Sequence, residues 1–269
     1  MTLQRIIIIL LLLPQFSEAQ TQEKEFRLFP QSNYFKSYLS DSRDIIIAPL
    51  HLKRQQWINT AIVSGIGIAL TTQDQYIYNF INDKQTSFSN NVSKYFLEPL
   101  GSGIYTIPFV GMMFLNGTLS HNKRQRQTSL SATKAIIISG IMVQISKQIF
   151  HRHRPYQDNI ANANNWDGPF SDIKYRSFPS GHSALVFSAA TVIASAYHYK
   201  KWITITAYSL STLSALSRIH DNDHWASDVF FGSLTGYLVG KIIYNNDFMN
   251  NDKINAGVTN NGIGIILKL

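Results

Sequence analysis

The chain has 269 residues, enough for one domain or at most two, and only 15% of them are charged. This is a low charged content, because a soluble globular protein usually has about 25% charged residues. The 45% hydrophobic content excludes a largely disordered chain. With 24 Lys and Arg against 16 Asp and Glu, the net charge of +8 should attract anions such as phosphate groups, acidic lipids or nucleic acid. The absence of cysteine excludes thiolate nucleophiles, disulfides, iron–sulfur clusters and cysteine zinc sites.

The first residues have the pattern of a secretory signal peptide. Arg5 precedes an apolar run over residues 6–13, and Pro14 and a small-x-small pattern ending at Ala19 follow. Because this run is much shorter than the roughly 20 residues that cross a bilayer, we expect cleavage after Ala19 rather than an anchor. The sequence divides into a signal peptide (1–19), a polar or amphipathic segment (20–56), a helical domain (57–244) and an Asn-rich tail (245–269).

Six segments of 12 to 17 residues lack Asp, Glu, Lys and Arg and run too long without turn signals for strands. They predict an all-α fold, a bundle of about six core helices. Asn/Gln/Ser-rich stretches at Thr71–Ser93 and Asn159–Asn165 are typical of linkers, and the tail around Asn-Asn-Gly at 260–262 could form a hairpin. The six segments are Trp57–Thr72, Ile104–Ser120, Ala135–Ser146, Ser183–Tyr199, Trp202–Ser217 and Val229–Gly240.

The same segments leave open whether the bundle lies in a membrane. Their lengths suit either buried core helices or short membrane spans, and the mean hydropathy of −0.06 favours a soluble protein while the low charge favours a membrane protein. Basic clusters at 53–54, 123–126 and 200–201 would lie on one face of a six-span protein, which favours membrane association. In that topology the chain before residue 57 lies in the cytoplasm, whereas a cleaved signal peptide would place it outside the cytoplasm. The two predictions agree only if the first segment does not span the membrane or if the signal remains as an anchor.

The first chemical motif is KQIFHRHRP, residues 147–155. Lys147 and Arg154 are two helical turns apart and would stack on one helix face if the helix continues, until Pro155 ends it. Two cations would then converge on one point. Taken alone, this motif also suits a positively charged helix end.

The second motif is FPSGHSA, residues 178–184, directly before an apolar segment. Ser180 and Gly181 at a helix start leave unpaired N–H groups that can bind an anion. His182 on the first turn could donate a proton to a bound oxyanion. The alternative is a serine N-cap with an incidental histidine.

The third motif is SRIHDNDHWASDV, residues 217–229. Asp228 follows His224 by four residues, so on a helix the carboxylate could orient one ring nitrogen and leave the other nucleophilic. Arg218 offers a fork of donors for phosphate oxygens. A rival interpretation is a metal site, because His220, His224 and Asp228 have i, i+4, i+8 spacing.

In this order the three motifs resemble the signature of the phosphatidic acid phosphatase type 2 and vanadium haloperoxidase superfamily, K-x6-RP, PSGH and SR-x5-H-x3-D. The resemblance covers roughly residues 135–244, with no departure inside the motifs. It implies that His224 attacks phosphorus and becomes a phosphohistidine, Asp228 orients it, and His182 protonates the leaving group. It also implies that the phosphate oxygens are held, without a metal or other cofactor, by Lys147, Arg154, Ser180, Gly181 and Arg218.

The expected function is a metal-independent phosphatase of phosphate monoesters or diphosphates, with envelope lipids such as phosphatidate, undecaprenyl diphosphate or lipid A as substrates. The expected location is the bacterial cell envelope, with the site facing the periplasm of a membrane-associated protein. Alternatives are a soluble periplasmic acid phosphatase on soluble phosphomonoesters, the metal-dependent hydrolase, a haloperoxidase or a non-catalytic phosphate-binding protein. Nucleic acid is not an expected partner, because no basic residues alternate with aromatics on a recognisable module.

Overall fold

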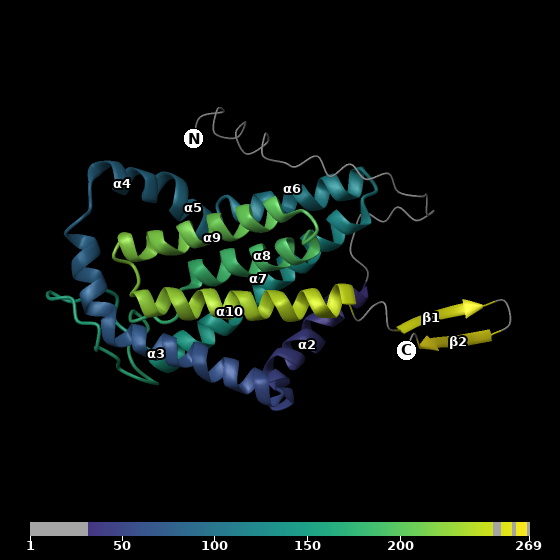
Figure 1. The fold of residues 1–269 in the computed structure, drawn as a ribbon, viewed down its shortest axis with the longest axis horizontal. Helices are drawn as coiled ribbons and strands as arrows, with labels where there is room; N and C mark the ends of the chain where they lie inside the picture. The colour runs from purple at the N-terminus through teal and green to yellow at the C-terminus, as the bar shows by residue number, and fades with distance from the viewer. Residues whose placement is uncertain (1–31, 250–253, 260–261, 268–269) are drawn as a thin grey trace.

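The computed structural model describes residues 32–249, 254–259 and 262–267, and the predicted signal peptide lies outside them. Long helices pack into one bundle (Figure 1). In chain order the elements are α2 (Ser32–Ile47), η1 (Ala48–His51), α3 (Arg54–Asn82), α4 (Ser87–Val92), η2 (Ser93–Leu97), α5 (Glu98–Gly101), α6 (Thr106–Leu119), α7 (Lys123–Phe150), α8 (Gly181–Ala196), α9 (Lys201–His220), α10 (Ala226–Tyr244), η3 (Asn245–Met249), β1 (Ile254–Thr259) and β2 (Gly262–Leu267).

The predicted all-α bundle is confirmed, because each of the six apolar segments lies largely within one helix, namely α3, α6, α7, α8, α9 or α10. The helices extend beyond the apolar segments where polar residues can cap them. For example, α7 begins at Lys123 because the Asn122 side chain accepts the N–H of Gln125 at 3.0 Å. The hairpin in the tail is also confirmed, with β1 and β2 paired antiparallel.

One predicted linker, Thr71–Ser93, is wrong. Helix α3 continues through its first half to Asn82, and α4 occupies most of the remainder. The helix persists because Ile77 and Ile81 pack against the core between α9 and α10, and tertiary burial outweighs weak helix propensity. The second predicted linker, Asn159–Asn165, does lie in the long loop between α7 and α8.

Helix α8 is the centre of the bundle and packs against α7, α9 and α10 (Figure 1). Its contact with α10 is close because α10 presents glycines to it. A Cβ atom on Gly232 would lie 2.3 Å from the backbone oxygen of Ser180, and one on Gly236 would lie 2.3 Å from that of Ala184. The two backbones therefore touch, and the spacing of α8 and α10 depends on the absence of side chains at these positions.

Four helix ends meet at one end of the bundle. The C-terminal ends of α7 and α9 and the N-terminal ends of α8 and α10 lie on the left in Figure 1, together with the end of α3. The first motif spans the end of α7, the second spans the start of α8, and the third spans both the end of α9 and the start of α10. The bundle therefore brings together segments that are far apart in the chain.

Candidate active site

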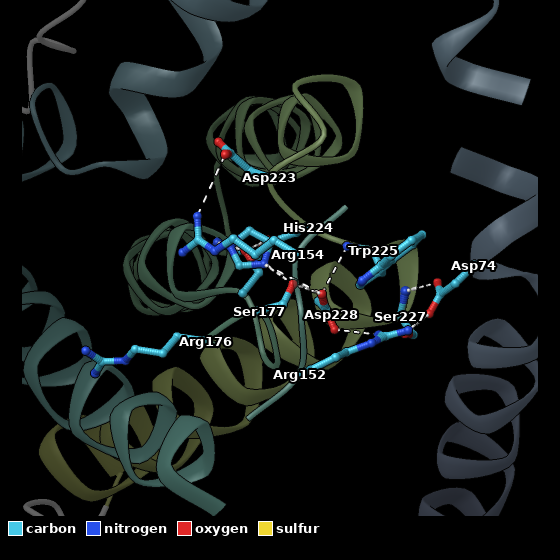
Figure 2. Close-up of polar contacts among 12 residues, drawn as sticks. Asp74, Arg152, Arg154, Arg176, Ser177, Asp223, His224, Trp225, Ser227 and Asp228 are labelled. Carbon is cyan, nitrogen blue, oxygen red and sulfur yellow. Dashed lines mark hydrogen bonds and ion pairs between the residues drawn. The ribbon is translucent and has the colours of Figure 1, made fainter. Parts of the chain in front are cut away.

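The third motif places a histidine beside a carboxylate. His224 lies in the turn between α9 and α10, and its Nδ1 is 3.7 Å from Oδ2 of Asp228 in the first turn of α10. The Ser177 hydroxyl donates to the same Oδ2 at 2.5 Å and lies 3.4 Å from Nδ1 of His224 (Figure 2). Because these contacts involve Nδ1, the opposite ring nitrogen, Nε2, is the atom suited to attack an electrophile.

The predicted helical face carrying His220, His224 and Asp228 is wrong. Helix α9 ends at His220, and α10 begins only at Ala226, so the i, i+4, i+8 spacing does not fall on one helix. The His220 ring instead contacts Asp221 and the Ser89 hydroxyl. Within the described ranges, no three His, Asp or Glu side chains are grouped so that they could hold a metal ion.

The imidazole of His224 is only 3% exposed. Burial lowers the pKa of His224 from 6.5 to about 3, an effect that nearby Lys147 and Arg154 strengthen and Asp228 opposes. The ring is therefore neutral at physiological pH, which is the protonation state that a nucleophile needs.

The first motif converges on the site, although its predicted helical continuation is wrong. Helix α7 ends at Phe150, and His151 takes a left-handed conformation with φ of 38° that turns the chain away. Lys147 is buried in the last turn and donates to the backbone oxygen of Arg176, whereas Arg154 approaches from the following loop. Both positive charges act on His224. The sequence therefore predicted that Lys147 and Arg154 meet, but not that Arg154 reaches the site from a loop rather than from the helix.

Two arginines of the site share one carboxylate. Arg218 is 2% exposed and its Nη1 donates to Oδ2 of Asp223 at 2.8 Å, while Nη1 of Arg154 lies 3.7 Å from Oδ1 of the same residue (Figure 2). Arg218 also pairs with Asp221. These pairs hold the guanidinium groups in place, and an arginine fork has further N–H donors for an anion.

The second motif forms a helix start, as predicted. Ser180 caps α8 and accepts the N–H of Ser183, and Gly181 is the first helical residue, so first-turn N–H groups are exposed to an anion. His182 follows on the first turn, with its Nε2 3.5 Å from Oε1 of Glu98 at the start of α5. Burial and the nearby Arg218 lower the pKa of His182, and the Glu98 carboxylate opposes this shift by favouring the protonated ring.

The motifs did not indicate several buried polar residues around Asp228. Arg152 and Asp74 are each 1% exposed, and Arg152 contacts both Asp74 and Asp228. Arg152 was visible as the first arginine of the HRHRP segment, but Asp74 lies in a stretch interpreted as a linker, so its burial could not be inferred. Ser177, Ser227 and Glu98 were missed as well.

A family model described as the PAP2 superfamily matches residues 129–252, which contain all three motifs. Over these residues the chain belongs to the PAP2 superfamily. The resemblance drawn from the motifs is confirmed.

One curated relative is the lipid A 1-phosphatase of Porphyromonas gingivalis, 30% identical over 141 residues. The match covers 51% of this chain and 28% of the relative, so the chain spans less than a third of that protein's length. Among solved structures, Aquifex aeolicus LpxE has a TM-score of 0.50 at 23% identity, covering 63% of this chain and 93% of that one. The transmembrane PAP2 phosphatidylglycerolphosphate phosphatase of Bacillus subtilis has a TM-score of 0.52 at 17% identity, covering 83% and 96%. These two likenesses support the fold of the PAP2 bundle.

Proposed function

We propose that this PAP2 protein is a phosphatase that hydrolyses phosphate esters through a phosphohistidine on His224, without a metal ion. The observation that carries the proposal is the neutral, buried His224, oriented by Asp228 and surrounded by the cations of the other motifs. The membership in the PAP2 superfamily supports it.

In the first step, the Nε2 lone pair of His224 forms a bond to phosphorus while the bond from phosphorus to the ester oxygen breaks. His182 donates its proton to that oxygen, so the alcohol leaves neutral. In the second step, water attacks phosphorus and gives a proton to His182, and the N–P bond breaks to release inorganic phosphate and restore His224.

The transferring phosphoryl group spreads negative charge over three equatorial oxygens, and stabilising this charge is the main task of the site. Lys147, Arg154 and Arg218 supply positive charge, and Ser180 and the Gly181 N–H supply hydrogen-bond donors at the start of α8. A proton donor such as His182 contributes about 10²- to 10⁴-fold in rate.

We propose that the substrate is a phosphorylated lipid of the bacterial envelope, of the phosphatidate, undecaprenyl diphosphate or lipid A type. One argument is the outer surface of the bundle. Four isoleucines spaced four apart on α7, at 137, 141, 145 and 149, are between 43% and 57% exposed, and α3 and α9 also expose isoleucines and leucines. Apolar surface of this extent is unfavourable in water and suits contact with lipid. The name of the P. gingivalis relative, a lipid A 1-phosphatase, supports the same class of substrate.

The membrane location is part of the same proposal. Among the described residues, α7 is the helix long and apolar enough to cross a bilayer, with a mean hydropathy of 1.4 over its most apolar window, and α6 and α8 are shorter apolar helices. The basic residues at 123–126 and 200–201 lie at the end of the bundle opposite the site. By the positive-inside rule that end faces the cytoplasm and the site faces the periplasm.

The deciding experiment measures phosphate release by detergent-extracted protein from one lipid phosphate and one soluble phosphomonoester, with His224→Ala alongside. We expect a strong preference for the lipid and no turnover by the variant. Equal or better use of the soluble ester would make the protein a periplasmic acid phosphatase. More than a few per cent activity in His224→Ala would remove His224 from the nucleophilic role.

A further inference from the structure

Arg152 is the centre of a buried polar cluster behind His224. Its Nη1 donates to Oδ1 of Asp228 at 2.7 Å and to the Ser227 hydroxyl at 2.8 Å (Figure 2). Its Nη2 donates to Oδ2 of Asp74 at 2.6 Å and to the backbone oxygen of Ala163 at 2.9 Å. A single guanidinium thus joins two buried carboxylates, one on α3 and one on α10.

The two oxygens of Asp228 have separate partners. Oδ1 accepts from Arg152, whereas Oδ2 accepts from Ser177 and from the backbone N–H of Trp225 at 3.0 Å and faces His224. Contacts on both oxygens prevent the carboxylate from rotating about its Cβ–Cγ bond. The Arg152 contact therefore helps to determine which oxygen is presented to His224.

Arg152 is itself held on several sides. Its guanidinium carbon lies 4.4 Å from the ring centroid of Trp166 and 5.4 Å from that of Trp225. Asp74 also accepts the backbone N–H of Ser227 at 2.9 Å, so α3 is tied to both the arginine and the start of α10. The backbone oxygen of Arg152 accepts the N–H of Ser177 at 2.9 Å, which positions the hydroxyl that bonds Asp228.

We infer that Arg152, anchored by Asp74, is a positioning residue that orients Asp228 and through it the nucleophile His224. This inference rests on the proposed function. Arg152 contacts Asp228 rather than the phosphate, so its loss should slow the chemical step and leave phosphate binding by Lys147, Arg154 and Arg218 intact. An arginine fork can bond two carboxylates at once, whereas a lysine supplies the charge but not the fork.

The test compares Arg152→Lys with the wild type. We expect kcat to fall about 10- to 100-fold, because small misplacements of reacting groups have effects of this size, while KM changes by less than about twofold. Orthovanadate can accept a bond from the nucleophile, so its affinity, measured by calorimetry, should fall about tenfold, whereas the affinity for inorganic phosphate should stay within about twofold. Asp74→Asn should lower kcat in the same direction by a smaller factor, since Arg152 keeps its contact with Asp228.

Lys134 provides a matched control. It is a fully buried cation on α7 paired with two carboxylates, Asp41 and Asp247, and none of these residues belongs to the site. Lys134→Met should lower the melting temperature and leave kcat and vanadate affinity per folded molecule unchanged. If Arg152→Lys and Asp74→Asn both behave like Lys134→Met, the inference is wrong although the phosphatase assignment stands. If the wild type binds neither vanadate nor phosphate, the proposed function fails, and the inference with it.

Discussion

The backbone N–H of Ser180 donates to the backbone carbonyl of Asp228 at 2.9 Å, which joins the start of α8 directly to the start of α10. Ser180 belongs to the second motif, and Asp228 belongs to the third. The proposed proton donor His182 and the proposed nucleophile His224 are therefore placed on two segments that are hydrogen-bonded to each other. Displacing one segment should disturb both functions.

The first prediction concerns Gly232, whose position allows this contact. An alanine Cβ there would lie 2.3 Å from the Ser180 oxygen, so Gly232→Ala must push α8 and α10 apart. We expect a loss of about 1–3 kcal/mol in the free energy of unfolding and a lower kcat. Gly140→Ala on α7 is the control, because nothing lies within 4 Å of a Cβ there. Equal melting temperatures and rates for the two variants would contradict this interpretation.

The second prediction tests the role of His182. If His182 protonates the leaving group, His182→Ala should lose about 10²- to 10⁴-fold in kcat on an alkyl or lipid phosphate. The loss should be much smaller on a nitrophenyl phosphate, whose leaving group needs little protonation. Rates on both substrates for both proteins check this. The same fractional loss on both would mean that His182 only binds phosphate.

The third prediction concerns metal ions. If cationic side chains hold the phosphate oxygens, as we propose, EDTA should leave phosphate release unchanged and vanadate should inhibit it. Assays before and after EDTA treatment, followed by addition of Zn²⁺, test this. Activity that disappears with EDTA and returns with Zn²⁺ would favour a metal-dependent hydrolase.

The fourth prediction follows from the low pKa of His224, about 3 against an ordinary 6.5. The neutral ring persists above about pH 4, so kcat/KM should show no acid-side loss centred near pH 6.5 once ionisation of the substrate is taken into account. The unfolded chain binds a proton at His224 below pH 6.5 while the folded protein does not, so stability should fall as the pH is lowered from 6.5 towards 3. A kcat/KM profile and melting temperatures over this range check both statements. Folded-state stability that rises with acidification would contradict the second.

The fifth prediction tests the proposed orientation in the membrane. The natural chain has no cysteine, so single cysteines report without background. In intact spheroplasts, a membrane-impermeant maleimide should label Phe170→Cys, because Phe170 is a fully exposed residue of the loop between α7 and α8. Lys201→Cys at the opposite end should react only after lysis. Labelling of both positions before lysis would indicate a soluble protein or a different topology.

Features that depend on residues close together in the sequence could be predicted, whereas features that depend on contacts between distant segments could not. Helix positions follow from apolar segments, and the helix start at Ser180 and Gly181 follows from the residues next to it in the sequence, so both could be predicted. Arg152 and Asp74 could not, because their pairing joins α3 to the loop after α7 and only the folded bundle brings them together. The helical spacing drawn for Lys147 and Arg154 failed because His151 ends α7 in a left-handed conformation that the sequence pattern does not show.

The position of Asp74 has a practical consequence for protein dissection. The family match begins at residue 129 and contains every motif residue, yet the second carboxylate on Arg152 comes from α3, well before that boundary. A fragment trimmed to the matched region would keep all three motifs but would lack Asp74, so the Arg152 guanidinium would lose one of its two carboxylate partners. We therefore expect that the smallest active fragment of this chain begins before Asp74. Grafting the three motifs alone onto another helical bundle should give a poorly active chimera.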